Sequence, residues 1–237
     1  CQQLFQKVQH LSVTGDNIQT SLVIQVIKSA RAENLKMTYF LCCVAVACLV
    51  SASAATAETP ADPEKFISNG VVPDVLDQAP SALACVKYGS LNVDQGNILT
   101  PSQVKHQPKV NYAASSEKFY TLIMVDPDAP SRITPLFREW LHWRVVNIPG
   151  NNVTQGQTSA EYRGAGPPKG TGLHRYVFAV FEQPSGQMSI DEPYLTADQK
   201  SASDRGKFSV KKFVSKYSLG NPVAGNFFQA EWEAAPK

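Results

Sequence analysis

The sequence contains few cysteines and little net charge, and both shortages narrow the possible functions. Of five cysteines in 237 residues, only Cys85 lies beyond residue 57, which excludes a disulfide-stabilised scaffold there. The formal net charge is +2, and basic and acidic residues are equal in number after residue 57. Charge alone therefore gives no basis for binding nucleic acid or an anionic membrane. We expect the unpaired Cys85 to be buried, as free cysteines usually are.

The sequence motifs of common catalytic and nucleotide-binding sites are also missing. There is no Gly-x-Ser-x-Gly segment, and no histidine lies near Cys85 in the sequence. The glycine-rich segment 163–172 lacks the spacings of a P-loop or a dinucleotide-binding loop. Asp126 and Asp128 resemble the start of a calcium loop, but two nearby prolines and the lack of a later Gly and Glu exclude an EF-hand. These absences make nucleophilic catalysis and nucleotide binding weak interpretations of the sequence.

No hydrophobic run is long enough to span a bilayer, but one has the length of a signal peptide. The run Tyr39–Val50 has 12 residues, whereas a membrane-spanning helix needs about 20. Small residues follow and end in Ala55-Thr56-Ala57, which matches the pattern cleaved by signal peptidase. Only Lys36 supplies positive charge directly before the run. We predict a signal peptide at 37–57 and a secreted protein without a transmembrane span.

Residues 1–36 precede Met37, the first methionine, and we interpret them as translated leader sequence that is absent from the natural protein. The alternative is a real N-terminal extension with a buried hydrophobic helix at 39–50. In the first interpretation the secreted protein is residues 58–237, the size of one ordinary domain. Asn152-Val153-Thr154 is then a sequon, with Asn152 as the predicted site of N-glycosylation.

The secreted part shows the patterns of β-strands more often than those of helices. Residues 118–125 form a nearly continuous apolar run that predicts a strand buried on both faces. Further strands are predicted at 140–148 and 175–181. The mixture of Pro, Gly, Asn and Val at 80–112 indicates short strands and turns.

Two short helices are predicted outside these strands. Asp62-Pro63 favours the start of the first helix, and Asn69-Gly70 ends it. Apolar residues with helical spacing run over Val210–Tyr217, where Ser209 can cap the start. We expect this second helix to end at Gly220. The predicted fold is therefore mostly β with a few short helices.

Polar side chains gather where the three long predicted strands begin or end. Asp126 ends the first strand, and His142 lies in the second. His174 and Tyr176 begin the third, directly after the glycine-rich segment 163–172. These elements can bring a carboxylate, two imidazoles and a phenol close together.

Strict alternation along the second strand predicts the direction of its side chains. His142 then shares a face with Trp140 and Arg144, opposite Leu141 and Trp143. The third strand places Tyr176 and His174 on one face by the same rule. We therefore expect each histidine to have an aromatic neighbour two residues away on its own face.

The residue types at these positions allow three interpretations. Two histidines and one carboxylate could bind a metal ion, although no short spacing between histidines supports this. Imidazole N–H, tyrosine O–H and backbone N–H groups of the glycine-rich segment could instead bind an anion. In the third interpretation these polar groups only satisfy one another inside a β core. The residues alone leave the choice open.

Several segments resemble the signature segments of the phosphatidylethanolamine-binding protein family. In order, they are Asp126–Arg132 (DPDAPSR), Arg138–Trp143 (REWLHW) and Gly164–Tyr176 (GAGPPKGTGLHRY). Pro222–Gly225 and Gln229–Trp232 also resemble the family's C-terminal strand, so the resemblance covers about residues 62–232. It implies a large antiparallel sheet flanked by a smaller sheet, with a few short peripheral helices and a small anion pocket at the surface.

The resemblance also implies which residues form this pocket. By their positions in the motifs, the residues expected to line it are Asp126, His142, His174 and Tyr176. Those expected to shape it are Pro130, Glu139, Trp140, Gly166, Pro167 and Pro168. The family binds phosphate-bearing groups such as the phosphoethanolamine head of a phospholipid. This implies a binding protein for such a ligand that is not an enzyme and has no cofactor and no metal. Because a carboxylate repels phosphate, we expect Asp126 to orient a histidine or to meet the ammonium of ethanolamine. The resemblance further implies cis peptide bonds at Ala129–Pro130 and Arg138–Glu139.

Other functions follow from the same resemblance and the same residues. The family includes serine-protease inhibitors and kinase-pathway modulators, and secretion favours a protease as the protein partner. A metal-dependent hydrolase using Asp126, His142 and His174 is a third possibility. Family members usually continue into a C-terminal helix beside the pocket. This sequence stops at Lys237, shortly after Trp232, so we expect a more open pocket.

Overall fold

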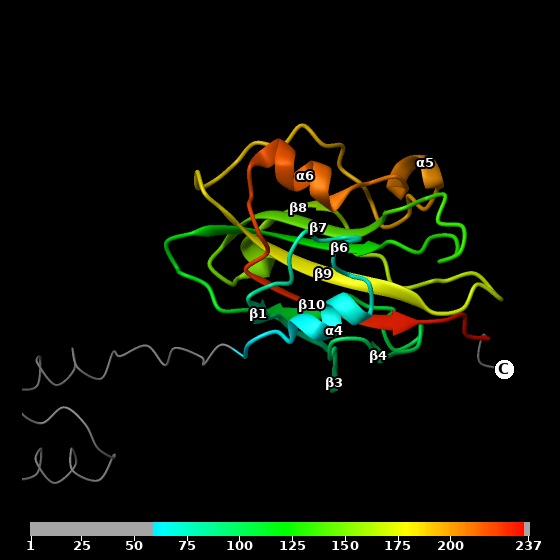
Figure 1. Ribbon diagram of the computed structural model, residues 1–237. Helices are drawn as coiled ribbons and strands as arrows, with labels where there is room; N and C mark the ends of the chain where they lie inside the picture. Colours follow the sequence, from blue (N-terminus) through cyan, green and yellow to red (C-terminus); the bar gives the residue numbers. More distant parts are fainter. Residues whose placement is uncertain (1–58, 235–237) are drawn as a thin grey trace, which may run out of the picture. The chain divides into compact units, whose positions relative to one another are not determined.

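The computed structural model describes residues 59–234, which form a mostly β fold (Figure 1). The predicted leader at 1–36 and signal peptide at 37–57 lie outside the described residues. Within 59–234, no helix combines the length and the apolar character needed to cross a bilayer.

A seven-stranded sheet forms the centre of the fold, with β9 between β6 and β10 (Figure 1). The strand order is β1-β10-β9-β6-β7-β8, and β4 also pairs with β10. The long strands are β6 (Phe119–Asp126), β7 (Trp140–Pro149), β9 (His174–Gln183) and β10 (Ala224–Ala230), with β8 (Gln157–Ala160) at one edge. These neighbours are antiparallel, as predicted. The whole sheet is nevertheless mixed, because β1 (Ala82–Leu83) and β4 (Asn97–Ile98) run parallel to β10.

The predicted smaller sheet is also present and has the order β3-β2-β5. Its strands are β2 (Cys85–Tyr88), β3 (Leu91–Asn92) and β5 (Lys109–Asn111). Side chains of β2 alternate, so Val86 and Tyr88 face the core while Cys85 faces solvent. The expectation that Cys85 is buried is therefore wrong.

The large sheet is covered by apolar side chains on both faces. On one face, Leu122 and Met124 of β6 pack in a cluster that includes the smaller sheet. On the other face, Ile123 and Val125 pack in a cluster that includes two helices. The prediction of a strand buried on both faces is thus confirmed for β6. Each such side chain contributes about 1.5–3 kcal/mol relative to an exposed one.

The two predicted helices are confirmed, with one correction. Helix α4 (Pro63–Ser68) begins at Asp62, whose side chain accepts a hydrogen bond from the backbone N–H of Glu64. Helix α6 (Val210–Tyr217) begins at Ser209. It ends at Ser218, before the predicted Gly220, because Ser218 adopts the left-handed conformation with φ of 53°. Two short elements were not predicted, α5 (Ala202–Arg205) and the 3₁₀ turn η1 (Val153–Gln155).

A β-bulge interrupts β7 at His142. Met124 of β6 pairs with Trp143, and the next residue, Val125, pairs with Leu141. His142 is therefore an extra residue between two paired positions. This bulge could not be read from the pattern of apolar and polar residues.

The bulge overturns the predicted faces around His142. Leu141 packs in the cluster beneath the helices, whereas Trp143 packs between the two sheets. The guanidinium of Arg144 lies 5.3 Å from the ring centroid of Phe213 in α6. His142 instead packs edge-on against Tyr176 of β9, with 5.2 Å between ring centroids. Strict alternation is thus wrong here, and the side chains of His142 and Tyr176 meet although β6 lies between their strands.

Candidate functional site

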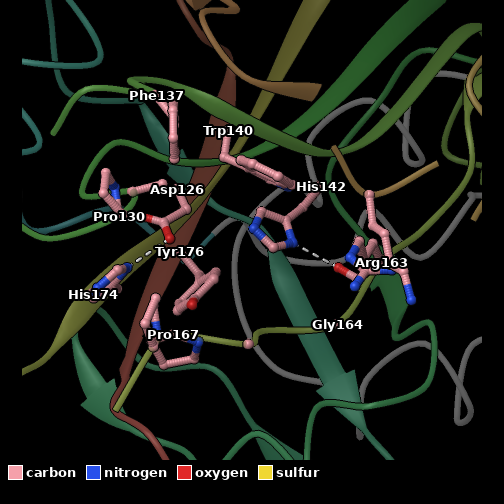
Figure 2. Close-up of a pocket in the computed structure, with 14 residues that line it drawn as sticks. Asp126, Pro130, Phe137, Trp140, His142, Arg163, Gly164, Pro167, His174 and Tyr176 are labelled. Carbon is pink, nitrogen blue, oxygen red and sulfur yellow. Dashed lines mark hydrogen bonds and ion pairs between the residues drawn. The ribbon is translucent and has the colours of Figure 1, made fainter. Parts of the chain in front are cut away.

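A surface pocket of about 230 Å³ lies where β6 ends and where β7 and β9 begin (Figure 2). Its lining consists of Asp126, Ala129, Pro130, Phe137, Trp140, His142, Arg163, Gly164, Gly166, Pro167, Pro168, His174, Tyr176 and Lys200. The structure therefore brings together all of the predicted site residues except Glu139. The peptide bonds Ala129–Pro130 and Arg138–Glu139 beside the pocket are both cis.

The first side of the pocket is built around Asp126. Its Oδ2 atom lies 2.8 Å from Nδ1 of His174, and its Oδ1 atom accepts a hydrogen bond from the backbone N–H of Asp128 at 2.7 Å. Both carboxylate oxygens are thus engaged within the protein. This is the geometry of a carboxylate that orients a histidine, the first of the two roles expected for Asp126.

Thr171 fixes the other nitrogen of the same histidine. The Thr171 hydroxyl donates to the carbonyl oxygen of Pro168 at 2.8 Å, and its oxygen lies 2.9 Å from Nε2 of His174. Because the hydroxyl has only one proton, Thr171 must accept from Nε2. Each ring nitrogen of His174 therefore has a hydrogen-bond partner within the protein.

His142 has a different hydrogen-bond pattern. Its Nδ1 atom lies 2.7 Å from the carbonyl oxygen of Arg163, which can only accept, so Nδ1 carries a proton. Burial lowers the pKa of His142 to about 4, and the ring is therefore neutral at pH 7. Its Nε2 atom is then a hydrogen-bond acceptor, and none of the residues 59–234 donates to it. We expected imidazole donors in the pocket, and His142 does not fit that expectation at neutral pH.

Tyr176 forms the floor between the two histidines. Its ring is fully buried and stacks on Phe228, with 4.9 Å between centroids and 13° between planes. Burial raises the pKa of Tyr176 well above its usual value, so the hydroxyl keeps its proton. Tyr176 can therefore donate a hydrogen bond to a ligand oxygen.

Glu139 does not face the pocket. Its Oε2 atom accepts a hydrogen bond from the backbone N–H of Val210 at 2.8 Å, at the start of α6. Backbone hydrogen bonds with Phe208 tie the same residue to the segment before the helix. Burial raises the pKa of the Glu139 carboxyl to about 7. Glu139 therefore connects α6 to β7 and supports the pocket from outside.

Sequence reasoning missed several lining residues. Arg163 and Gly164 belong to the glycine-rich segment, and their position before the prolines was the available signal. Phe137 stands next to the second family-like segment and packs on Trp140, with 6.3 Å between ring centroids. Lys200 had no signal, because it lies in an irregular segment far along the chain.

A buried arginine holds the segment that carries Lys200 in place. The guanidinium of Arg205 donates to the carbonyl oxygens of Gln199 and Thr196 in that segment. It also donates to the carbonyl of Leu141 at 2.9 Å, in the strand that carries His142. Arg205 thus links the Lys200 side of the pocket to β7 through backbone carbonyls.

The charges of the lining favour an anion over a cation. Asp126 is the one carboxylate among the lining residues, and both of its oxygens are engaged. Arg163 and Lys200 add two cationic side chains. Within residues 59–234, no three His, Cys, Asp or Glu side chains are grouped so that they could hold a metal ion.

The sequence and the fold were compared with known proteins. The family model described as phosphatidylethanolamine-binding protein matches residues 89–228. A Drosophila melanogaster protein provisionally named odorant-binding protein A5 is 42% identical over 164 residues, which cover 69% of this chain and 77% of that protein. The 26 kDa secreted antigen of Toxocara canis is 42% identical over 167 residues, covering 70% of this chain and 63% of the antigen.

A solved structure of an inhibitor bound to its proteinase is also similar to this chain. The carboxypeptidase Y inhibitor, crystallised with its cognate proteinase, is 28% identical with a TM-score of 0.60. The match covers 72% of this chain and 94% of the inhibitor. Together with the matched family model, these similarities show that the chain belongs to the phosphatidylethanolamine-binding protein family.

Proposed function

We propose that this protein is a non-enzymatic binding protein for small phosphate-bearing groups, such as phosphoethanolamine or the head of phosphatidylethanolamine. The observation that carries the proposal is the set of hydrogen-bond donors and cationic side chains that line the pocket. Tyr176 offers a hydroxyl donor, and Arg163 and Lys200 supply positive charge. These groups suit the oxygens of a phosphate, which are acceptors with negative charge.

The neutral His142 ring adds a requirement to this ligand. Its Nε2 atom accepts a hydrogen bond, so the matching ligand group must donate one. A protonated phosphate oxygen or the ammonium of ethanolamine can do so. The other expected acceptor for the ammonium, Asp126, has both oxygens engaged. His142 is therefore the better partner for the donor group of the ligand.

The size of the pocket limits how much of a lipid can enter. Its volume of about 230 Å³ is smaller than the pockets of about 300–1,000 Å³ that typically enclose drug-sized ligands. A head group fits this space, and acyl chains would remain outside. The proposal therefore concerns recognition of the head group.

An NMR titration tests the proposal. The full chain in a phosphate-free buffer is titrated with phosphoethanolamine while the ring signals of the histidines are followed. We expect saturable shifts for His142 and His174 and none for His106, which is exposed and outside the pocket lining. A folded sample in which His142 and His174 do not shift would contradict the proposal.

Secretion forms part of the proposed function. The relative from Toxocara canis is named a secreted antigen, and the sequence predicts a signal peptide at 37–57. The predicted sequon residue Asn152 is exposed on the turn after β7, where a glycosyltransferase could reach it. N-terminal sequencing of secreted material should give an N-terminus near Glu58, and a glycosidase should lower its apparent mass.

A second candidate function is inhibition of a secreted protease. The similarity to the carboxypeptidase Y inhibitor favours it. The two functions are separated by the substitution His142→Ala, measured for both head-group binding and protease inhibition. If inhibition survives while head-group binding is lost, the two activities use different surfaces. If no protease of the secretory pathway is inhibited by the wild-type chain, this second candidate is withdrawn.

A further inference from the structure

The two most exposed large apolar side chains of residues 59–234 lie on one loop beside the pocket. We call residues 130–137, between β6 and β7, the rim loop. Ile133 is 95% exposed and Leu136 is 65% exposed. Single exposed apolar residues are common on proteins. An isoleucine that is almost fully exposed does not contribute to the stability of the core. Two such exposed apolar side chains on one short loop indicate a binding surface.

The rim loop is held in a defined conformation. The backbone N–H of Thr134 donates to the carbonyl of Ser131 at 3.1 Å, and that of Phe137 donates to the carbonyl of Ala129 at 3.0 Å. A side-chain nitrogen of Arg132 donates to the carbonyl of Asn69, which ties the loop to the end of α4. These bonds close the loop at its base and leave its tip exposed.

The ends of the rim loop are part of the pocket. Pro130 and Phe137 both line it, and Figure 2 shows them on the same side of the cavity as Asp126. The exposed Ile133 and Leu136 lie between these two lining residues in the chain. A surface that covers the tip of the loop would therefore also lie next to the mouth of the pocket.

The glycine-rich segment 163–172, on another side of the pocket, also places a cation beside an exposed apolar side chain. The ammonium of Lys169 lies 4.9 Å from the ring centroid of Trp232, and that ring is 42% exposed. The rim loop and residues 163–172 together carry Arg132, Arg163 and Lys169 but no acidic residue. Arg132 also lies 4.0 Å from the buried carboxylate of Asp128. Aliphatic tips, an exposed tryptophan and clustered cations are features of proteins that bind the surface of an anionic bilayer.

We infer that the rim loop inserts its apolar tip into the surface of an anionic lipid bilayer, so that the pocket meets the phosphate of a lipid still in the membrane. The inference rests on the proposed function, because it takes the pocket as the site for that phosphate. It also accounts for the small pocket volume, since the acyl chains need not leave the bilayer. Burial of the two aliphatic side chains and attraction of the cations would act together.

Vesicle sedimentation tests this inference with the full chain. The probes are vesicles of phosphatidylcholine alone and vesicles of phosphatidylcholine with phosphatidic acid. We expect the wild-type chain to bind the second kind more strongly. The double substitution Ile133→Asn and Leu136→Asn should weaken this binding about tenfold or more. The apolar double substitution Ile133→Phe and Leu136→Phe should keep it.

Two controls separate the rim loop from general surface effects. Ile98→Asn removes a side chain that is 62% exposed but lies on β4, outside the rim loop and the pocket lining, and should change vesicle binding less than about twofold. The polar double variant should still show the phosphoethanolamine-induced shift of His142, which also reports that it is folded. Failure of that shift in the wild type as well would instead count against the proposed function.

Three results would overturn the inference. The first is equal vesicle binding by the wild type and the polar double variant. The second is an equal loss in Ile98→Asn, which would mean that any exposed isoleucine contributes. The third is a wild-type chain that ignores both kinds of vesicle, which would assign the rim loop to a protein partner such as a protease.

Discussion

The two histidines of the pocket are both buried, yet their hydrogen-bond patterns are opposite. His174 is 1% exposed and both of its ring nitrogens are engaged, by Asp126 and by Thr171. His142 is 4% exposed and has one engaged nitrogen, which donates to the carbonyl of Arg163. In Figure 2 the Asp126–His174 contact and the His142–Arg163 contact lie on either side of Tyr176.

This difference separates a supporting side of the pocket from a side that meets the ligand. Every polar atom in the Asp126–His174–Thr171 set has a partner within the protein, so a ligand would have to displace an existing bond. Nε2 of His142 faces the pocket without such a bond from the described residues. We therefore expect substitutions on the first side to change stability most, and substitutions on the second side to change affinity most.

The largest expected effect is on the supporting side. Asp126→Asn removes the charge that holds the buried His174 ring and should lower the free energy of unfolding by about 3 kcal/mol or more. Urea unfolding of the full chain measures this loss. Asp77→Asn is the matched control, because Asp77 pairs with Lys211 at an exposed position and should cost less than about 1 kcal/mol. Similar small losses in both variants would contradict the assigned role of the Asp126–His174 pair.

The next effect concerns pH and tests the neutral state of His142. The pKa of His142 is lowered from 6.5 to about 4 in the folded chain. As pH drops from about 6.5 to 4, the unfolded chain therefore protonates this histidine more than the folded chain does, and the free energy of unfolding decreases. The pKa of Glu139 is raised from 4.5 to about 7, so stability falls as pH rises over about 4.5 to 7. Each contribution amounts to about 3 kcal/mol. The two contributions change the free energy of unfolding in opposite directions as pH changes. Between pH 5 and 6 they should nearly cancel in the wild type.

Removing one of the two groups should reveal the pH dependence that the other gives to the free energy of unfolding. Glu139→Gln leaves His142, and the free energy of unfolding should then increase with pH between about 4 and 6.5. His142→Asn leaves Glu139, and the free energy should decrease with pH between about 4.5 and 7. Urea unfolding across this pH range gives both curves. If the free energy of unfolding depended on pH in the same way in both variants, burial would not shift the pKa values of His142 and Glu139 as described.

Much of the fold could be predicted from local patterns. The caps of α4 and α6 are set by Asp62 and Ser209, and the buried strand β6 follows from its continuous apolar run. The bulge at His142 could not be predicted, because it depends on how β7 pairs with β6 rather than on the residues of β7 alone. Cys85 shows a similar limit, since its exposure depends on which face of β2 meets the large sheet.

The candidate site was predictable to the extent that its residues lie in short motifs. Resemblance to the family supplied the motif residues, and all except Glu139 line the pocket. Motif position cannot distinguish a side chain that points into a pocket from one that, like Glu139, binds the start of a helix behind it. Lys200 shows the opposite error, because tertiary contacts such as those of Arg205 and Arg163 with its segment bring it to the pocket.

Affinity should depend on His142 more than on Thr171. His142→Asn provides an amide that can still donate to Arg163, but no acceptor at the position of Nε2, and should weaken phosphoethanolamine binding about tenfold. Thr171→Val removes an acceptor on the supporting side and should change stability by about 1 kcal/mol, with affinity nearly unchanged. Calorimetric titration together with urea unfolding measures both quantities. A larger affinity loss in Thr171→Val would reverse the assignment of the two sides.

The smallest effect is expected from Lys200, which is exposed at the edge of the ligand-binding side. Its attraction for a phosphate acts through solvent, so Lys200→Ala should weaken phosphoethanolamine binding only about two- to fivefold at low salt. Added salt screens charges over about 10 Å at 0.1 M, and the difference from the wild type should shrink accordingly. His142→Asn should keep its loss at every salt concentration, because a buried hydrogen bond is little affected by screening. An affinity loss in Lys200→Ala that persists in high salt would mean that Lys200 contacts the ligand directly, as His142 is proposed to do.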